Sequence, residues 1–456
     1  MQYLGIDYRL NSMPPLDPSF IPFGVWAKAY LKEAVFPFRI AVEREKGNIS
    51  VFSSKLRSKE ATGANLRFVE RFVKFLLWSV GGKRVYLCGC DAIAEELSKM
   101  YTPMGKRAFD VGFMKDVFEV PFEIVICDEA HFPNAHESTK SIGGHLNGCR
   151  IGFDAGGSDR KVSAVIDGQT VYSEEVVWFP KLNDDPAYQF AGIVDSFKTA
   201  AAKLPRVDAI GVSSAGVFVG NSPMVSSLFI KVPRSHREEV KSIYDRAAKE
   251  IGDVPIVVAN DGDVSALAGA MSLNAGNVMG LAMGTSEAVG YVNGEGHILG
   301  WFNELAFAPV DLNEKAMRDE WSGDIGVGCK YFSQDAVIKL AANAGLSLDG
   351  DSPAEKLKSA QKLAESGSET ALDIFRSIGV YLAHTLVLYS EIYDLKYLLV
   401  LGRVASGVGG NVLMESCHRT LQADYPALAE KITVMLPDEK ARRVGQSIAA
   451  ASLPEV

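Results

Sequence analysis

The sequence predicts an α/β protein of two similar lobes with a cleft between them, preceded by an additional α/β module. Two observations support this prediction. Strand and helix patterns alternate from residue 149 onward, as in sheets built from strand-helix crossovers. Each half of that region opens with a hairpin whose tight turn holds only small residues, GGS and GTS. We expect three domains, 1–148, 149–261 and 262–456, with the last helix packing back on the first lobe.

Length and composition limit the classes of function. A chain of 456 residues is too long for one compact core. Its net charge is -9 and Lys and Arg are scattered, so we expect no nucleic-acid partner and no anionic membrane surface. Six cysteines without framework spacing, and a start with no basic region followed by an apolar core, predict a soluble cytoplasmic protein. A homodimer is compatible with this composition.

The first 148 residues have their own strand and helix patterns. We expect a hairpin over 38–54, an amphipathic helix over 65–80 and a strand over 84–89 that ends on the free buried thiols of Cys88 and Cys90. The apolar stripe of the helix predicts a core face, and the Lys and Arg residues between its members predict a solvated face. The stripe consists of Phe68, Phe72, Phe75 and Leu76.

The first lobe is expected to start with three antiparallel strands and to continue with crossovers. An Asp-Gly hairpin signal at DGQ joins the second and third strands. The expected elements are strands at 150–155, 161–167 and 170–178, a helix at 186–203, the strand VDAIGVSS, a helix at 235–251 and the strand PIVVAN.

The second lobe is expected to vary the same scheme. Two strands flank a small polar turn, and a third strand is predicted after Asn293-Gly294. Helices at about 333–344 and 370–393 follow, then the strand YLLVLG, a helix at about 410–422, the strand ITVML and a last helix at about 438–452.

The turn DAGGSDRK has the chemistry of a phosphate site. Backbone N-H groups at Gly156 and Gly157 can surround phosphate oxygens without adding positive charge, and Ser158 and Lys161 can add donors. Asp154 would repel phosphate, so its position makes sense if Mg²⁺ with bound water lies between them. The alternative is an ordinary hairpin turn.

Three further stretches favour the phosphate site. MGTSEAVG (283–290) is a second small-residue turn, and LVLGRVASGVGGN (399–411) is a buried strand followed by a glycine-rich loop that opens a helix. In VANDGDVSALAGAM (258–271), a strand places Asn260 and Asp261 at its carboxyl end. Ligands of open α/β sheets bind at that end, so the stretches together predict a nucleotide cleft.

These motifs carry a family resemblance. DAGGSDRK, VANDGDVSALAGA, GLAMGTSEAVG and VLGRVASGVGG resemble, in order and separation, the phosphate-1, catalytic, phosphate-2 and adenosine segments of the actin-like ATPase superfamily, which includes hexokinases. The closest resemblance is to sugar kinases of the ROK family, although GTS is similar to the FGGY carbohydrate kinases. The resemblance covers about residues 149–456 and implies two ribonuclease-H-like lobes.

The resemblance implies an ATP- and Mg²⁺-dependent carbohydrate kinase. Asp261 would be the base that accepts the proton of a sugar hydroxyl, with Asp263 as the fallback, and helix N-capping is the alternative role for both acids. Asn260, Asp263 and Glu304 would bind the sugar, and Asp154 would hold the metal through water. The nucleotide and its phosphates would contact Gly156, Gly157, Ser158, Lys161, Gly284, Thr285, Ser286, Gly402 and Arg403.

The sequence departs from the ROK pattern beside the sugar. Phe307 stands where ROK kinases have a histidine, and of their zinc-binding cysteines only Cys329 remains, so we expect no zinc there. The identity of the sugar therefore cannot be carried over.

Another stretch has zinc chemistry without a standard ligand spacing. It contains Cys127, His131, His136, His145 and Cys149. The alternative is a polar loop whose histidines only form hydrogen bonds.

Two other functions stay open. Some ROK members are sugar-responsive regulators, but those have an N-terminal winged helix-turn-helix, and residues 1–148 have strands and mixed charge instead. The other is a nucleotide-binding ATPase or scaffold that has lost phosphoryl transfer. The extra module could cover the cleft, recognise part of a larger substrate or form a dimer interface.

Overall fold

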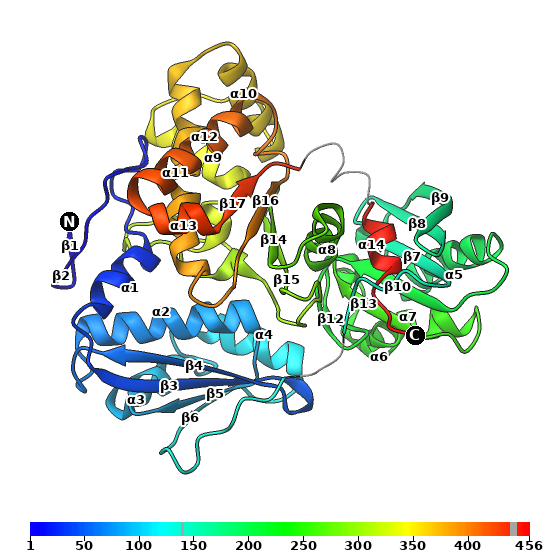
Figure 1. Ribbon diagram of the computed structural model, residues 1–456, viewed down its shortest axis with the longest axis horizontal. Helices are drawn as coiled ribbons and strands as arrows, with labels where there is room; N and C mark the ends of the chain where they lie inside the picture. Colours follow the sequence, from blue (N-terminus) through cyan, green and yellow to red (C-terminus); the bar gives the residue numbers. More distant parts are fainter. Residues whose placement is uncertain (138–140, 438–444) are drawn as a thin grey trace.

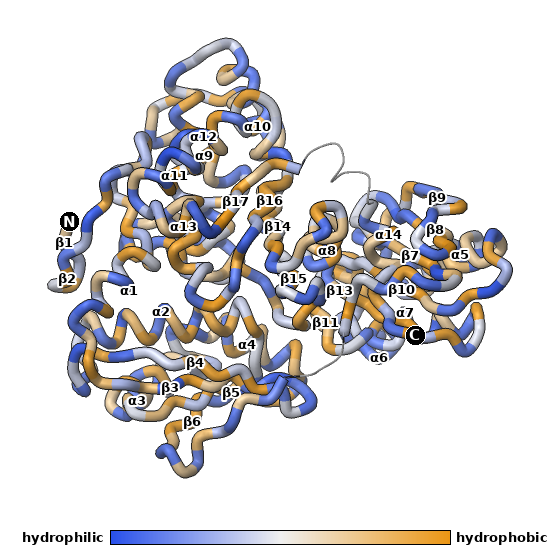
Figure 2. The backbone as a smooth tube through the Cα atoms, in the orientation of Figure 1, coloured by the Kyte–Doolittle hydropathy of each residue, from blue (hydrophilic) through white to orange (hydrophobic). Residues whose placement is uncertain are grey.

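The computed structural model describes residues 1–137, 141–437 and 445–456, and Figure 1 shows their arrangement. Two lobes and an N-terminal module each have a β-sheet of their own. Apolar segments concentrate in the sheets and in the helices that cover them (Figure 2).

The first lobe has a five-stranded sheet in the order β13-β10-β7-β8-β9, and its first three strands in the chain are antiparallel, as the sequence predicts. Side chains alternate along these strands, so Ile151 and Phe153 face one side, where they pack with Phe197 and Tyr244 of helices α5 and α7. Helix 235–251 of the prediction is broken into a 3-10 turn and two short helices. The elements are β7 (Cys149–Ala155), β8 (Asp159–Ile166), β9 (Gln169–Val177), α5 (Pro186–Ala201), β10 (Ala209–Ser214), η4 (Arg234–His236), α6 (Arg237–Lys241), α7 (Ile243–Lys249) and β13 (Ile256–Asn260).

The second lobe has a four-stranded sheet in the order β15-β14-β16-β17. The third strand predicted after Asn293-Gly294 is wrong: the described chain forms only a single bridge there, between Val292 and Ile298. Helix α10 was not foreseen. The elements are β14 (Val278–Met283), β15 (Glu287–Val292), α9 (Gln334–Asn343), α10 (Pro353–Glu365), α11 (Glu369–Tyr389), β16 (Tyr397–Leu401), α12 (Gly407–Asp424), α13 (Pro426–Lys431) and β17 (Thr433–Met435).

Helix α11 forms the centre of the second lobe. It is long and apolar enough to cross a membrane by length and composition alone, but 83% of its most apolar window is buried inside the protein. Its residues pack against α12, α9 and α1, so α11 is a core helix.

Two helices connect the lobes. Helix α8 (Asp261–Leu273) contacts β13 and β10 of the first sheet and β14 and β15 of the second. Helix α14 (Gln446–Ala451) packs on β7, β8 and β10 of the first lobe and on α8 (Figure 1). The sequence predicts this last helix over about 438–452, and residues 438–444 of that prediction lie outside the described residues.

The N-terminal module has a four-stranded sheet in the order β4-β3-β5-β6 (Figure 1). The predicted hairpin, helix and strand are all present, and Cys88 and Cys90 are free and buried. The first 31 residues behave differently: α1 packs on α11 of the second lobe, with Gly24 against Leu388. The elements are β1 (Gln2–Tyr3), β2 (Ile6–Asp7), α1 (Phe23–Leu31), β3 (Phe36–Glu43), β4 (Ile49–Leu56), α2 (Gly63–Val80), β5 (Arg84–Cys88), α3 (Asp91–Met100), α4 (Ala108–Phe118) and β6 (Glu123–Ile126).

The module is joined to both lobes. One continuous apolar core includes Phe38 and Trp78 of the module together with Phe307 and Tyr381 of the second lobe. On the other side, α4 contacts the hairpin of β11 (Val217–Val219) and β12 (Ser222–Val225) in the first lobe. Glu119, at the end of α4, forms ion pairs with Arg237 and Lys241 of that lobe. The module therefore contacts both lobes.

The predicted solvated face of α2 is wrong. Phe68, Phe75 and Leu76 are fully buried, as expected of a core face, but Arg71 and Lys74 are also almost inaccessible, with exposed fractions of 2% and 1%. Both cations are buried because acids from distant segments neutralise them, which local periodicity cannot reveal.

Candidate active site

The first glycine turn connects β7 and β8. The indole Nε1 of Trp178 donates to the carbonyl of Gly156 at 2.7 Å, and the backbone N-H of Trp178 donates to the carbonyl of Ser158 at 3.1 Å. The Ser158 hydroxyl is exposed and donates to Asp159 at 3.0 Å. Trp178 therefore holds the turn in place by donating hydrogen bonds to two carbonyls of the turn.

Lys181 lies against this turn and was missed by sequence reasoning. It follows β9 in the 3-10 helix η2 (Pro180–Leu182), and a Cβ built on Gly157 would lie 2.8 Å from its Nζ. Its positive charge also acts on Asp261, where it favours the ionised carboxylate. The only sequence signal was a lysine directly after the third strand of the sheet.

Asp154 and Lys161 are register partners on β7 and β8. The hydroxyl of Ser213 donates to Oδ1 of Asp154 at 2.8 Å. Burial raises the pKa of Asp154 to about 6, and repulsion from Asp261 adds to the rise. The Lys161 ammonium lies 3.4 Å from Glu175, so it is engaged in an ion pair beside the turn.

Asp261 is the first residue of α8. The helix is capped by Asn260, whose Oδ1 accepts from Gly262 N at 2.7 Å while its Nδ2 donates to the carbonyl of Gly216 at 2.7 Å. Because Asn260 caps the helix, capping does not account for the presence of Asp261 or Asp263. The Asp261 carboxylate is half-buried and accepts from Gly262 N at 3.0 Å, and burial raises its pKa.

Asp263 and Glu304 lie close to Asp261. The buried Asp263 accepts from the backbone N-H of Tyr291 at 3.1 Å and from Asn303 Nδ2 at 2.8 Å, so it ties α8 to β15. Burial raises the pKa of Asp263 to about 7. Burial also raises the pKa of the half-buried Glu304 to about 7, and repulsion from Asp261 and Asp263 adds to the rise.

The second small turn connects β14 and β15. Gly284 N donates to the carbonyl of Ser286 at 3.0 Å, and the carbonyl of Gly284 accepts from Gln334 N at 3.0 Å. Thr285 and Ser286 are exposed. The turn thus exposes two hydroxyls to solvent, and the hydrogen bond from Gln334, the first residue of α9, holds its backbone in place.

The loop after β16 packs against this turn. Gly402 has φ of +90°, and a Cβ there would lie 2.4 Å from the carbonyl oxygen of Met283, so only glycine fits. Gly402 lines a cavity of about 560 Å³ together with Ser265, Ser406 and Gln446. Arg403 is exposed and lies outside this lining.

The cavity adjoins Asp261 through shared residues. The hydroxyl of Ser265 donates to the backbone carbonyl of Asp261 at 2.8 Å. Gln446 Nε2 donates to the same carbonyl at 2.8 Å and to Ser213 Oγ at 3.1 Å. Gln446, which lines the cavity, therefore connects the predicted catalytic and metal segments through hydrogen bonds.

Glu287 is a second residue that sequence reasoning missed. It follows the GTS turn, its Oε1 accepts from Tyr389 at 3.2 Å, and its Oε2 is buried without a hydrogen-bond partner. Burial raises the pKa of Glu287 to about 8, and repulsion from Glu304 adds to the rise. The only signal was an acid at the first position of a buried strand.

Glu287 should make stability depend on pH. Because the pKa of Glu287 is higher in the folded chain, its carboxyl contributes fully to the free energy of unfolding below the unfolded pKa of about 4.5. This contribution is lost as the pH rises through the folded pKa of about 8. We expect Glu287→Gln to match the parent chain at about pH 4.5 and to exceed its free energy of unfolding by about 1–3 kcal/mol near pH 8.5. Urea unfolding at several pH values without ligand measures this, with the exposed Glu295→Gln as control. An unchanged pH slope in Glu287→Gln would contradict the assignment.

The positions that differ from the ROK zinc site have other contacts. Phe307 packs 4.4 Å from Trp78 and 5.3 Å from Trp321 between ring centroids. The buried Cys329 thiol lies 3.5 Å from Asp319 Oδ1. Within residues 1–137, 141–437 and 445–456, no three His, Cys, Asp or Glu side chains gather as metal ligands, the segment with His131 and His145 included.

No family model and no curated protein matches the chain by sequence. Solved structures do match it by fold. The ROK hexokinase from Thermus thermophilus aligns over 67% of this chain and 97% of its own, with a TM-score of 0.50 and 17% identity. The chain has the fold of the ROK proteins. A ROK family transcriptional regulator, a homologue of the E. coli MLC protein, aligns over 68% of this chain and 79% of its own, with a TM-score of 0.51 and 16% identity.

The ROK fold confirms the fold class predicted from the four motifs. It accounts for about two thirds of the chain and is shared by kinases and regulators, so it does not decide between these functions. The remaining third has no counterpart in these alignments.

Proposed function

We propose that the protein is an ATP-dependent kinase that transfers the γ-phosphoryl group to a hydroxyl of a sugar or sugar derivative. The observation that carries the proposal is the position of Asp261. Its half-buried carboxylate begins the helix between the two sheets, interacts electrostatically with Asp154 and Glu304, and is not consumed by helix capping.

Asp261 would act as the general base. As the acceptor hydroxyl attacks the γ-phosphorus, its proton passes to the Asp261 carboxylate, and the bond from phosphorus to the bridging oxygen of ADP breaks. The hydrogen bond from Gly262 N orients one carboxylate oxygen. Burial raises the pKa of Asp261, which makes the carboxylate a better proton acceptor near neutral pH.

Glu304 would bind the sugar, and Asn260, whose Oδ1 and one Nδ2 hydrogen are bonded to Gly262 and Gly216, would contact it through the second Nδ2 hydrogen. Glu304 lies near Asp261, and a carboxylate accepts hydrogen bonds from sugar hydroxyls. Asp263 is already occupied by Tyr291 and Asn303, so its role would be to hold the frame around the sugar site.

ATP would lie across the two small turns with its adenosine in the cavity beside Gly402. Gly156, Gly157, Ser158, Gly284, Thr285 and Ser286 would surround the phosphates. The oxygen donors near the first turn fit Mg²⁺, because Asp154 has one oxygen bonded to Ser213 and another available for a metal-bound water. Bound Mg²⁺ would neutralise charge on the phosphates. The proposed setting is the cytoplasm, where ATP is abundant.

Lys181 would stabilise the negative charge on the transferred group. We expect Lys181→Met to lower kcat by about 10²-fold, because it removes a cation beside the first turn. Lys181 is exposed, so the melting temperature should change little. Steady-state ADP release measures kcat, with the exposed Lys231→Met as control. Full activity of Lys181→Met would remove Lys181 from the mechanism.

A coupled ADP-release assay with Mg-ATP and a panel of sugars, polyols and sugar acids tests the proposed function. We expect ADP release that depends on one class of acceptor. Release without any acceptor would indicate an ATPase instead. Stabilisation by a sugar without ADP release would indicate a sugar-sensing regulator.

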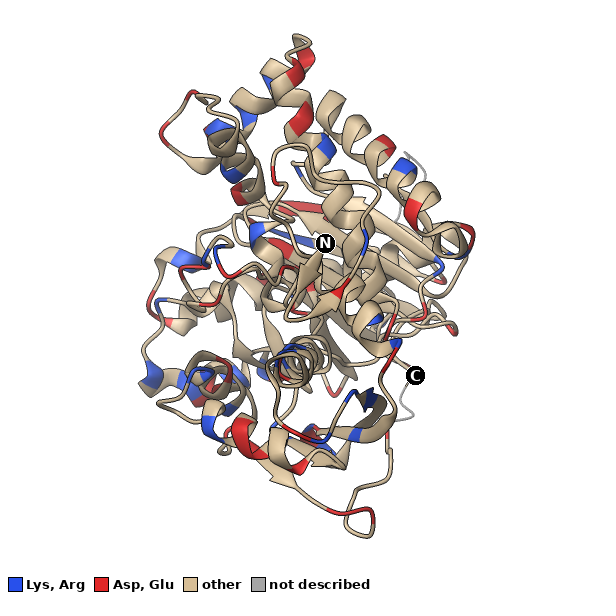
Figure 3. Cartoon of the chain, turned by 90° about the vertical axis from the view of Figure 1, so that its left-hand side faces the viewer, with Lys and Arg blue, Asp and Glu red and all other residues tan. Residues whose placement is uncertain are grey.

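The fold shared with a ROK regulator keeps regulation as the second candidate. The N-terminal region argues against DNA binding, because its sheet and helices carry both signs of charge (Figure 3) and the cations Arg71 and Lys74 of α2 are buried.

A further inference from the structure

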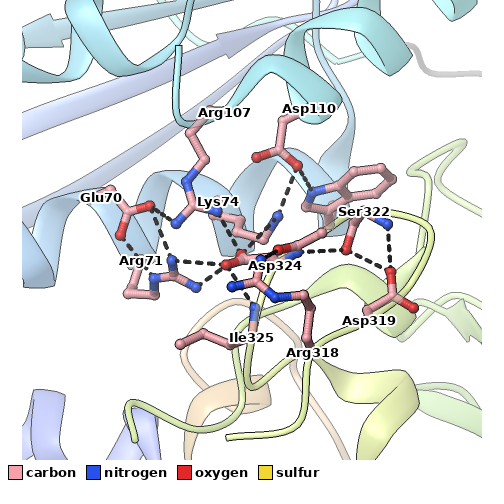
Figure 4. Close-up of polar contacts among 12 residues, drawn as sticks. Glu70, Arg71, Lys74, Arg107, Asp110, Arg318, Asp319, Ser322, Asp324 and Ile325 are labelled. Atoms are coloured by element: carbon pink, nitrogen blue, oxygen red, sulfur yellow. Dashed lines mark hydrogen bonds and ion pairs between the residues drawn. The ribbon is translucent and has the colours of Figure 1, made fainter. Parts of the chain in front are cut away.

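A buried cluster of charges joins the N-terminal module to the second lobe. Figure 4 shows Arg71 and Lys74 of α2 and Arg107, just before α4, meeting Asp324 from a loop of the second lobe. Asp324 Oδ2 lies 2.6 Å from an Arg107 nitrogen, 3.1 Å from Arg71 and 3.4 Å from Lys74. We call this the floor cluster.

The floor cluster is electrically balanced. Glu70 pairs with both arginines, and Asp110 accepts from Lys74 Nζ at 2.8 Å. Its three cations therefore face three carboxylates, and each of the six side chains is at most 9% exposed. Neutralisation makes the burial of these charges tolerable, but it leaves no excess charge at the floor.

The floor cluster lies at the base of a hollow of about 370 Å³, and the mouth of this hollow is positively charged. Arg67, Lys106 and Arg318 line the mouth with a single acid, Glu314, which is 3.3 Å from Arg67. Arg318 donates to the carbonyl of Gly323 in its own loop. Among the described residues, the exposed Lys106 ammonium has no hydrogen bond or ion pair. The mouth thus has two excess positive charges on a chain whose net charge is -9.

The hollow also has an unused buried donor. Arg107 lines it and is 3% exposed, and its Nε has no hydrogen-bond partner among the described residues. A buried guanidinium N-H without an acceptor is unfavourable, so an oxygen atom in the hollow would stabilise it. Phe109 forms an apolar part of the wall, and the 63% exposed Trp321 packs on Phe109 with ring centroids 5.7 Å apart.

We propose that this hollow binds a small, multiply charged anion of the phosphate class. Guanidinium and ammonium groups bind phosphate oxygens through strong charge-assisted hydrogen bonds. The volume of about 370 Å³ suits a small phosphorylated compound. The lining residues of this site are distinct from those of the Asp261 region and of the cavity at Gly402.

The site is connected to Glu304. Lys74 and Trp78, one turn apart on α2, both donate to Asp110, and the backbone carbonyl of Trp78 accepts from Glu304 N at 2.9 Å. An anion that binds to Lys74 or Arg107 would shift α2 relative to Glu304. This consequence rests on the proposed function: the anion would change the KM for the sugar more than the kcat.

The test of binding requires no turnover. Isothermal titration calorimetry of the full chain uses inorganic pyrophosphate as the probe at fixed ionic strength, with citrate in a parallel titration. AMPPNP and Mg²⁺ are added in a second series, to separate this site from the proposed nucleotide cleft. We expect saturable pyrophosphate binding in both series and binding of citrate at least 10-fold weaker.

Three variants test whether the binding lies in the hollow. The double variant Lys106→Ala/Arg318→Ala removes mouth cations that take no part in the floor cluster, and it should raise the Kd for pyrophosphate at least 10-fold. A matched control, Lys358→Ala/Arg419→Ala, removes two exposed cations elsewhere in the second lobe and should leave the Kd unchanged. Tryptophan fluorescence should respond to pyrophosphate, and Trp321→Phe should weaken that response while the heat of binding persists, the remainder coming from Trp78, which donates to Asp110.

The proposal is overturned by any of three results. They are the absence of saturable pyrophosphate binding, an unchanged Kd in the double variant, and citrate binding as tight as that of pyrophosphate, which would indicate a carboxylate site. Failure of the kinase proposal would appear in the ADP-release assay and would leave these titrations unaffected.

Discussion

Asp261→Asn is expected to lower kcat for phosphoryl transfer by about 10³-fold, because asparagine cannot accept the proton of the attacking hydroxyl. The amide has the size of the carboxylate, and its oxygen can still accept from Gly262 N, so α8 should keep its start. Affinity for the nucleotide should change little. ADP release with the acceptor sugar measures kcat, and a thermal shift with Mg-AMPPNP measures nucleotide binding.

Two comparison variants make this result specific. Asp253→Asn changes an exposed acid near the end of the first lobe and should leave kcat unchanged. Asp263→Asn changes the fallback base, which already accepts from Tyr291 and Asn303, so we expect a smaller loss of kcat. The role of general base would belong to Asp263 if Asp261→Asn kept full activity and Asp263→Asn lost about 10³-fold in kcat, which is roughly the magnitude of general-base catalysis.

The sequence predicted most elements that depend on short stretches of chain, although the strand after Asn293-Gly294 and the unbroken helix 235–251 were wrong. Strand, small turn and strand follow one another within about 18 residues at Asp154, so pattern and turn chemistry were sufficient. The same holds for Asn260 and Asp261, which stand where strand β13 meets helix α8. The ROK fold confirms the fold class that the four motifs predicted.

Other features depend on partners that are distant in sequence. The periodicity predicts a solvated Arg71 because Asp324, one of the two acids that neutralise it, lies 253 residues away. Lys181 reaches Gly157 only after the chain has completed β8 and β9. Glu287 is buried and bonded to Tyr389, which lies 102 residues away, and nothing in the GTS turn indicates that burial. Charged residues whose roles depend on tertiary pairing are therefore the part of the site that periodicity does not predict.

Gly211→Val is expected to lower the free energy of unfolding by about 3 kcal/mol or more, because helix α14 lies directly on the sheet. A Cβ built on Gly211 of β10 would lie 1.7 Å from the backbone oxygen of Ala450. The adjacent Gly152 of β7 has the same relation to Ser447, also at 1.7 Å. Because the opposing atoms belong to the helix backbone, no side-chain rotation can relieve the clash, and α14 must move away.

Displacement of α14 should also affect the site, because α14 begins with Gln446, which donates to the carbonyl of Asp261 and to Ser213. We therefore expect weaker nucleotide binding in Gly211→Val even where the chain stays folded. Urea unfolding measures the first effect and a thermal shift with Mg-AMPPNP the second. Gly112→Ala is the matched control: this exposed glycine of α4 has no atom within 4 Å of a built Cβ, so alanine should stabilise the chain by about 0.5–1 kcal/mol. If Gly211→Val unfolds at the same urea concentration as the parent chain, α14 does not dock on this face of the sheet, and the contact between Gln446 and Asp261 must be abandoned with it.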